Sequence, residues 1–157
     1  MFAEPQHWQP LLRIVVAMAL AAVVGMEREM AARPAGLRTH MLVGGAAALF
    51  VSVGDLLVGS LKAELAPGVL RTDPLRMIEA VITGVSFLGA GTIVRHGPRD
   101  VEGLTTAASL LLVTAAAVTV AVGQVLLALG TIALALLTLR GMQWLERRVA
   151  ARTRDGD

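Results

Sequence analysis

Long apolar runs separated by short polar stretches make up the pattern of this chain. A helix needs about 20 apolar residues to cross the hydrocarbon layer of a bilayer, and five segments approach that length. They predict transmembrane helices at residues 10–27, 41–59, 75–95, 104–122 and 124–140. The expected fold class is therefore all-α, an integral membrane bundle of about five transmembrane helices.

The last two of these segments run almost without a break from Leu104 to Leu139. A single helix of that length would measure about 54 Å, far more than the hydrocarbon core of a bilayer, which is about 30 Å thick. The polar and flexible pair Gly123-Gln124 is the one plausible turning point within the run. We therefore expect two helices with a tight reversal between them.

Composition supports a lipid environment. The chain has 157 residues, of which 55% are hydrophobic and 3% aromatic, and its mean hydropathy is +0.69. Its abundant small side chains suit helices that pack closely in lipid. The absence of cysteine excludes disulfides and thiolate metal sites. The first ten residues lack the basic region of a secretory signal, so the first apolar run is expected to stay in the protein.

The basic residues indicate topology rather than nucleic-acid binding, because they lie between the hydrophobic segments and not in one patch. With the N-terminus outside, ten of them fall on the cytoplasmic side: Arg28, Arg33, Arg38, Arg95, Arg99, Arg140, Arg147, Arg148, Arg152 and Arg154. The other side holds four: Arg13, Lys62, Arg71 and Arg76. This asymmetry predicts an N-out, C-in, multi-pass protein.

Two parts of the chain differ in composition. Residues 1–141 form the expected transmembrane domain, and residues 142–157 form a basic cytoplasmic tail. This tail is expected either to lie against anionic lipids as an amphipathic helix or to remain a frayed end that only sets orientation. Membrane lipids are the partners expected from this arrangement.

Polar motifs from four loop ends meet on the cytoplasmic side of this topology. We define them as the cytoplasmic polar cluster: Glu27, Arg28, Glu29, Arg33, Arg38, Thr39, His40, Arg95, Thr105, Thr106 and Ser109. In a functional interpretation, the carboxylates and arginines form a partly desolvated ion network that binds a partner or gates access. In a structural interpretation, they pair at the headgroup level, where exposed ion pairs contribute about 0 to 1 kcal/mol.

Asp55 and Glu79 form a predicted acidic pair near the outer ends of the second and third segments. Carboxylates in membrane segments are costly and suggest a function, but two of them make at most a weak, hydrated Mg²⁺ site. The alternative is an ion pair of either carboxylate with Arg13 or Arg76. The three histidines are scattered, and no metal site or cofactor is predicted.

Small residues in the third and fourth segments have two interpretations each. Gly84, Gly89 and Gly91 serve either helix packing or a local break that lines a cavity. Thr105 or Thr106 is expected to cap the fourth helix, whose free amides could bind an anion. Thr105 and Ser109 share a helix face, and the alternative is that they hydrogen-bond to the third helix.

Catalytic motifs are missing from the sequence. There is no Gly-x-x-x-x-Gly-Lys phosphate loop, no His-Glu-x-x-His pair and no Gly-x-Ser-x-Gly nucleophile turn. We therefore expect a protein that is not an enzyme.

Four motifs together resemble the membrane domain of the MgtC/SapB family. They are Gly-x-Glu-Arg-Glu at 25–29, Arg-Pro-Ala-Gly-Leu-Arg-Thr-His at 33–40, Phe-Leu-Gly-Ala-Gly-Thr-Ile at 87–93 and Val-x-Gly-Leu-Thr-Thr-Ala-Ala-Ser at 101–109. The resemblance implies a bacterial inner-membrane protein linked to growth at low magnesium and, in some members, to survival in macrophages. It also implies a regulatory role toward the ATP synthase and the membrane potential rather than transport itself.

The chain departs from this family pattern in three ways. It ends soon after the fifth segment, where the namesake proteins continue into an ACT-like domain. It has Leu110 and Leu111 where many relatives place tryptophan, and Thr105 where the virulence-associated branch has asparagine. Regulation through the ACT-like domain is therefore not carried over, and these departures count against a virulence role and ATP synthase binding in this member.

Three functional hypotheses follow from the sequence. The first is a non-enzymatic inner-membrane protein of magnesium or membrane-energy homeostasis that acts through the cytoplasmic polar cluster, alone or with a membrane protein partner. The second is an ion transporter or channel subunit that acts as a homo-oligomer, with Asp55 and Glu79 at its mouth. The third is a structural scaffold in a membrane complex.

Overall fold

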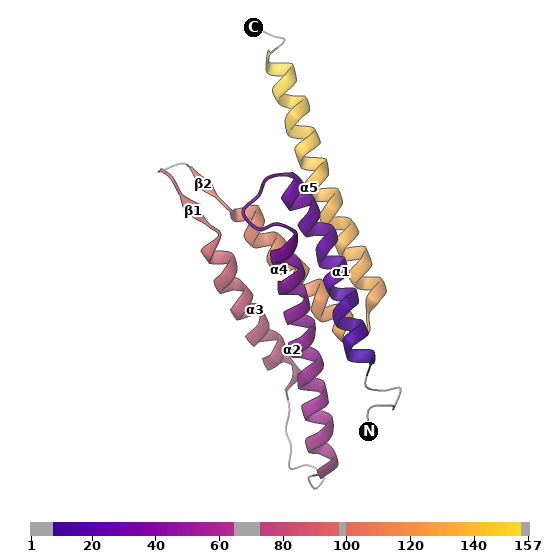
Figure 1. Ribbon diagram of the computed structural model, residues 1–157. Helices are drawn as coiled ribbons and strands as arrows, with labels where there is room; N and C mark the ends of the chain where they lie inside the picture. Colours follow the sequence, from indigo (N-terminus) through magenta and orange to yellow (C-terminus); the bar gives the residue numbers. More distant parts are fainter. Residues whose placement is uncertain (1–7, 65–72, 98–99, 155–157) are drawn as a thin grey trace.

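The computed structural model describes residues 8–64, 73–97 and 100–154, which form one bundle of five helices (Figure 1). The helices are α1 (Gln9–Met30), α2 (Leu37–Glu64), α3 (Pro74–Gly91), α4 (Leu104–Ala121) and α5 (Val125–Arg154). A two-stranded antiparallel hairpin of β1 (Val94–Arg95) and β2 (Val101–Glu102) connects α3 to α4. The expected helical membrane bundle is confirmed.

Local sequence signals place the helix ends. Asp73 caps α3 by accepting a hydrogen bond from the Leu75 amide at 3.0 Å, and Pro74 supplies a preset φ at the first helical position. The reversal between α4 and α5 lies at Gly123, as predicted, with a φ of +87°. The Gly123 and Gln124 amides donate to the Val120 and Thr119 carbonyls. This Schellman motif provides hydrogen-bond donors for carbonyl groups in the last turn of α4.

The hairpin after α3 was not predicted. The third helix was expected to run to residue 95, but it ends at Gly91, and Thr92 donates its hydroxyl to the Gly89 carbonyl at 2.8 Å. Ile93 and Val94 continue the apolar run, so hydrophobicity does not mark this end. The hairpin returns through Gly103, which has a φ of +89° and where a Cβ would lie 1.9 Å from the Thr92 carbonyl oxygen.

The core is built around α4, which contacts each of the other four helices. Its inner face carries small buried residues, including Ala116 and Ala117, and these pack with buried alanines of α1 and α2. The most extensive helix contact is between α1 and α2. A Cβ on Gly44 of α2 would lie 2.8 Å from the Ala21 Cβ of α1. The small side chains therefore allow the close packing expected for helices in lipid.

Four of the five helices are long and apolar enough to cross a membrane: α1, α2 from Leu37 to Lys62, α4, and α5 from Val125 to Met142. The remaining helix, α3, carries Arg76 and Glu79 in its first two turns and falls outside this group. It packs mainly on α4, and an apolar groove of about 580 Å³ separates part of it from α2.

The bundle has two distinct ends. The α1–α2 turn, the hairpin and the C-terminal part of α5 lie at the upper end in Figure 1, and the start of α1 and the α4–α5 turn lie toward the lower end. The predicted gathering of loop ends on one side of the bundle is therefore present. Which side of the membrane this end faces stays a prediction.

Helix α5 has 30 residues, which corresponds to about 45 Å. It extends well past the other helices at the upper end of the bundle (Figure 1). The expected boundary between residues 141 and 142 lies within this helix, so the backbone of the basic tail continues α5 as far as Arg154.

Candidate functional site

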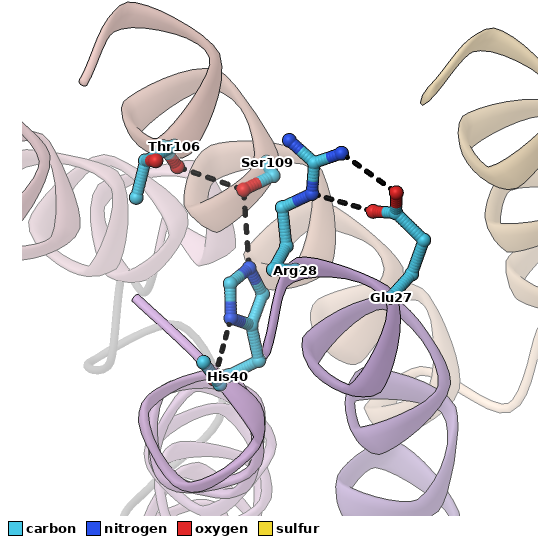
Figure 2. A network of polar contacts seen from close by, with 6 residues as sticks. Glu27, Arg28, His40, Thr106 and Ser109 are labelled. Atoms are coloured by element: carbon cyan, nitrogen blue, oxygen red, sulfur yellow. Dashed lines mark hydrogen bonds and ion pairs between the residues drawn. The ribbon is translucent and has the colours of Figure 1, made fainter. Parts of the chain in front are cut away.

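An ion pair lies inside the bundle near the end of α1. The Arg28 Nε and Nη2 atoms donate to the two Glu27 carboxylate oxygens at 2.5 Å and 2.9 Å, so the pair is bidentate (Figure 2). Glu27 is 3% exposed and Arg28 is 2% exposed. Two parallel charge-assisted hydrogen bonds fix the mutual orientation of the two groups as well as their charge.

A second polar contact joins α2 to α4 beside this ion pair. The His40 side chain is fully buried; its Nδ1 lies 2.9 Å from the Gly36 carbonyl oxygen, and its Nε2 lies 3.1 Å from the Ser109 hydroxyl oxygen. The Ser109 hydroxyl also lies 2.8 Å from the carbonyl oxygen of Thr106, at the start of α4. Figure 2 shows the His40 imidazole pointing toward Ser109.

A glycine brings α1 and α2 together at this point. A Cβ on Gly25 would lie 2.8 Å from the Leu37 Cα and 2.9 Å from the His40 Cβ. The start of α2 can therefore pack directly against the α1 backbone, and this contact carries His40 into the interior. We call Glu27, Arg28, His40, Thr106 and Ser109, all buried, the buried polar cluster.

The composition of this cluster is unusual for a helical membrane bundle. Ionisable side chains in apolar helices are costly, and they mark functional sites when they face the interior. A buried ion pair is weak evidence for stability, because its desolvation offsets much of the attraction between the charges. For these two reasons we take the buried polar cluster as the candidate functional site of this chain.

The other members of the predicted cytoplasmic polar cluster are exposed: Glu29, Arg33, Arg38, Thr39, Arg95 and Thr105. Glu29 has a structural role, since its Oε2 accepts the Leu37 amide at 2.7 Å and so caps the start of α2. Among the described residues, Arg33, Arg38 and Arg95 make no ion pair. The expected network between these arginines and the two glutamates is therefore not formed there.

The predicted outer acidic pair is not assembled in the described part of the chain. Asp55 and Glu79 are both exposed, and neither forms a salt bridge there. Arg13, one expected partner, donates to the Ala121 carbonyl oxygen at 2.8 Å, at the C-terminal end of α4. The negative end of the α4 dipole favours a cation at this position.

The glycines of α3 were expected to serve either helix packing or a local break that lines a cavity, and they differ in their surroundings. Gly89 is buried, and a Cβ there would lie 3.4 Å from the Ala107 Cβ of α4, so it serves helix packing. A Cβ on Gly84 or Gly91 would meet nothing within 4 Å. Gly84 also lines the apolar groove between α2 and α3.

The start of α4 differs from what was expected. The N-cap is Gly103, without a side-chain hydrogen bond, and neither Thr105 nor Thr106 caps the helix. The expected hydrogen bond to α3 is also wrong for Ser109, because this hydroxyl contacts His40 of α2. Among the residues whose side chains the structure describes, no three histidine, aspartate or glutamate side chains are grouped so that they could hold a metal ion.

Two residues of the site were not predicted from the sequence. The Gly36 carbonyl is a partner of His40, and Gly25 provides the close contact of α1 with α2. Both residues belong to motifs that were recognised, Gly-x-Glu-Arg-Glu and Arg-Pro-Ala-Gly-Leu-Arg-Thr-His. The available signal was therefore a glycine within each polar motif, which often marks a close backbone approach.

Comparison with known proteins identifies the family. The model of the MgtC family matches residues 14–148. SrpB of Synechococcus elongatus is 36% identical over 154 residues, which cover 93% of this chain and 82% of SrpB. The "Putative magnesium transporter YhiD" of Escherichia coli is 33% identical over 129 residues, 82% of this chain and 58% of YhiD.

MgtC of Salmonella typhimurium is 36% identical over 114 residues, which cover 73% of this chain and 44% of MgtC. The chain therefore spans most of SrpB but less than two thirds of YhiD and of MgtC. No solved structure gives a significant match. Because the family model covers most of the chain, including the whole buried polar cluster, this protein belongs to the MgtC family.

Proposed function

We propose that this chain is a non-catalytic, multi-pass protein of the bacterial inner membrane that acts in magnesium limitation and membrane-energy homeostasis. Its membership of the MgtC family supports this class of function. The name of the relative YhiD, a putative magnesium transporter, supports the link to magnesium. The protein acts through the buried polar cluster.

The observation that carries the proposal is the ion pair and imidazole held between α1, α2 and α4. Glu27 and Arg28 come from α1, His40 from α2, and Thr106 and Ser109 from α4 (Figure 2). A change in the protonation or pairing of any one of them alters contacts between helices. Glu27 and Arg28 lie near the end of α1, His40 near the start of α2, and Thr106 near the start of α4. These helix ends lie at the end of the bundle where the loops gather (Figure 1).

Growth at low magnesium tests this proposal. A strain that lacks its own copy of the gene is complemented with the full chain or with Glu27→Gln, Arg28→Gln or His40→Gln. We expect these three variants to lose rescue at low magnesium and to have no effect at high magnesium. Arg38→Gln and Thr131→Val are matched controls, since Arg38 is exposed and the Thr131 hydroxyl bonds only within its own helix.

Immunoblots of isolated membranes establish that each variant is present in normal amounts. Full rescue by all three cluster variants at normal abundance would show that the cluster is not the working site. A growth defect that is equal at every magnesium concentration would contradict the link to magnesium.

Transport of Mg²⁺ by a homo-oligomer is the second candidate, supported by the name of YhiD and by the exposed carboxylates of Asp55 and Glu79. Flux into proteoliposomes separates it from the regulatory proposal. Magnesium uptake by the purified chain that is lost in Glu79→Gln would favour transport. Absence of uptake, together with loss of rescue in the cluster variants, would favour regulation.

A further inference from the structure

The contacts of His40 form a chain that requires more protons than a neutral site contains. The Gly36 carbonyl, His40 Nδ1, His40 Nε2, the Ser109 hydroxyl and the Thr106 carbonyl follow one another through three contacts of 2.9, 3.1 and 2.8 Å. Both ends are carbonyl oxygens, which only accept hydrogen bonds. Three hydrogen bonds between these groups need three protons.

A neutral imidazole and a hydroxyl supply two protons, and an imidazolium and a hydroxyl supply three. The Gly36 carbonyl oxygen can only accept and lies 2.9 Å from Nδ1, so Nδ1 carries a proton in both forms. Nε2 is therefore the atom that gains or loses a proton. In the neutral form, the Ser109 hydroxyl must turn from Thr106 to donate to Nε2. The Thr106 carbonyl remains satisfied in that form, since α-helical carbonyls accept the amide four residues ahead.

We infer that His40 is a proton-binding site of this bundle, at which Nε2 exchanges the proton and the Ser109 hydroxyl reverses its hydrogen bond. Protonation makes the contact between α2 and α4 charge-assisted, and such bonds are roughly twice as strong as neutral ones. The proton therefore changes the strength of the link between these two helices.

The charged groups around the imidazole balance one another. The charged groups near it are Glu27 and Arg28 of α1, which pair and carry no net charge together. From α4, the groups that face it are the uncharged Ser109 and Thr106. On the connection to α2, the Glu29 carboxylate binds the Leu37 amide. Binding of a proton thus adds the single unbalanced charge of the cluster.

A cavity borders the residue that contacts Nε2. A partly open cavity of about 250 Å³ lies between α4 and α5, with Val24 of α1 in its wall, and Ser109 lines it. Thr105 and Thr138 add two further hydroxyls to the same wall. Ser109 thus borders the cavity and also contacts His40.

Nitrogen NMR of the imidazole tests this inference. The full chain carrying His7→Gln and His96→Gln keeps His40 as its single histidine, and it is labelled with ¹⁵N-histidine in lipid nanodiscs. As the pH is lowered from about 8 to about 5, we expect conversion from a neutral form protonated at Nδ1 to a form protonated at both nitrogens. If the double variant does not fold, the same signals are read in the unsubstituted chain, with His96 identified by its loss in His96→Gln.

Two further variants test the role of Ser109. We expect Ser109→Ala to shift the Nε2 resonance of the neutral form and to leave the Nδ1 resonance nearly unchanged. Thr114→Val is the matched control, because it removes a buried α4 hydroxyl that bonds only the Leu110 carbonyl. The inference is overturned if His40 keeps one protonation state throughout, if its neutral form is protonated at Nε2, or if Ser109→Ala leaves Nε2 unchanged.

The proton site does not depend on the proposed role in magnesium limitation, because the NMR signals report the imidazole itself. Titration without any growth phenotype of His40→Gln would retain the proton site and contradict the proposed function. Loss of rescue in His40→Gln, with no titration of the His40 imidazole, would contradict the proton site and retain the proposed function.

Discussion

Glu27 and Arg28 are consecutive residues of α1 and yet face each other in the interior. Neighbouring positions on a helix point in different directions, so both side chains bend toward a common space between α1 and the helices packed on it. Each charge balances the other in a place from which water is largely excluded. The pair is therefore expected to behave as a unit.

Removing both charges of the pair should cost less stability than the two single removals added together. Glu27→Gln leaves the buried Arg28 guanidinium without the carboxylate that binds it, and Arg28→Gln removes the bidentate partner of Glu27. We expect each to lower the free energy of unfolding by about 3 to 5 kcal/mol. The double variant Glu27→Gln/Arg28→Gln should be less destabilised than the two losses added together. Denaturant titration in mixed micelles measures all three, with the exposed Arg38→Gln as control. Strict additivity of the two single losses would contradict the coupling.

Gly25 is the second residue on which the site depends. In Gly25→Ala the new methyl group would meet the Leu37 Cα and the His40 Cβ at less than 3 Å, so α2 must move away from α1. We expect a loss of about 1 to 3 kcal/mol in the free energy of unfolding, together with a changed His40 resonance.

Gly84→Ala is the matched control for Gly25→Ala. Nothing lies within 4 Å of the added methyl group, and alanine favours the helix by up to about 1 kcal/mol over glycine. Equal losses of stability in the two variants would show that Gly25 has no special packing role.

At the level of elements, two helix ends use the same motif with different residues. The α1 end places Ala32 at a φ of +53°, and the Ala32 and Arg33 amides donate to the Glu29 and Arg28 carbonyls. The α4 end places Gly123 in the equivalent position. The left-handed conformation costs an L-residue about 1 to 2 kcal/mol, so the α1 end is strained and the α4 end is not.

Exchanging the two residue types should have opposite effects. We expect Ala32→Gly to raise the free energy of unfolding by about 1 kcal/mol and Gly123→Ala to lower it by a similar amount. Thermal unfolding of both variants in the same detergent measures the difference. A loss of stability in Ala32→Gly would contradict the strain and indicate that the alanine methyl group contributes packing.

At the scale of the whole molecule, the bundle groups its connections at two ends (Figure 1). The predicted orientation puts the α1–α2 turn and the hairpin in the cytoplasm. The chain contains no cysteine, so single introduced cysteines report accessibility without background. Arg33, His96 and Gln124 are exposed and mark the α1–α2 turn, the hairpin and the α4–α5 turn.

Labelling of these three cysteine variants with an impermeant maleimide tests the orientation. We expect Gln124→Cys to react in intact spheroplasts, and Arg33→Cys and His96→Cys to react only after the membrane is opened. The opposite labelling pattern would show that the predicted orientation is wrong, but it would still agree with the arrangement of the helices in the bundle. Labelling of Arg33→Cys and His96→Cys from different sides would contradict the arrangement of the helices itself.

The sequence by itself determined the helical bundle, its reversal at Gly123 and the order of its polar motifs. Apolar runs of membrane length require helices, since these satisfy every backbone group within one segment. It did not determine the end of α3, because the apolar run passes through Val94 into the hairpin.

Only the tertiary structure selected the site from the eleven residues of the cytoplasmic polar cluster. Burial depends on which helices meet, and the close contact at Gly25 carries His40 inside, while Arg38 and Thr39, its neighbours on α2, stay exposed. The contact between His40 and Ser109 spans 69 positions of the chain. A local pattern cannot encode such a distance, because it is set by the packing of α2 against α4.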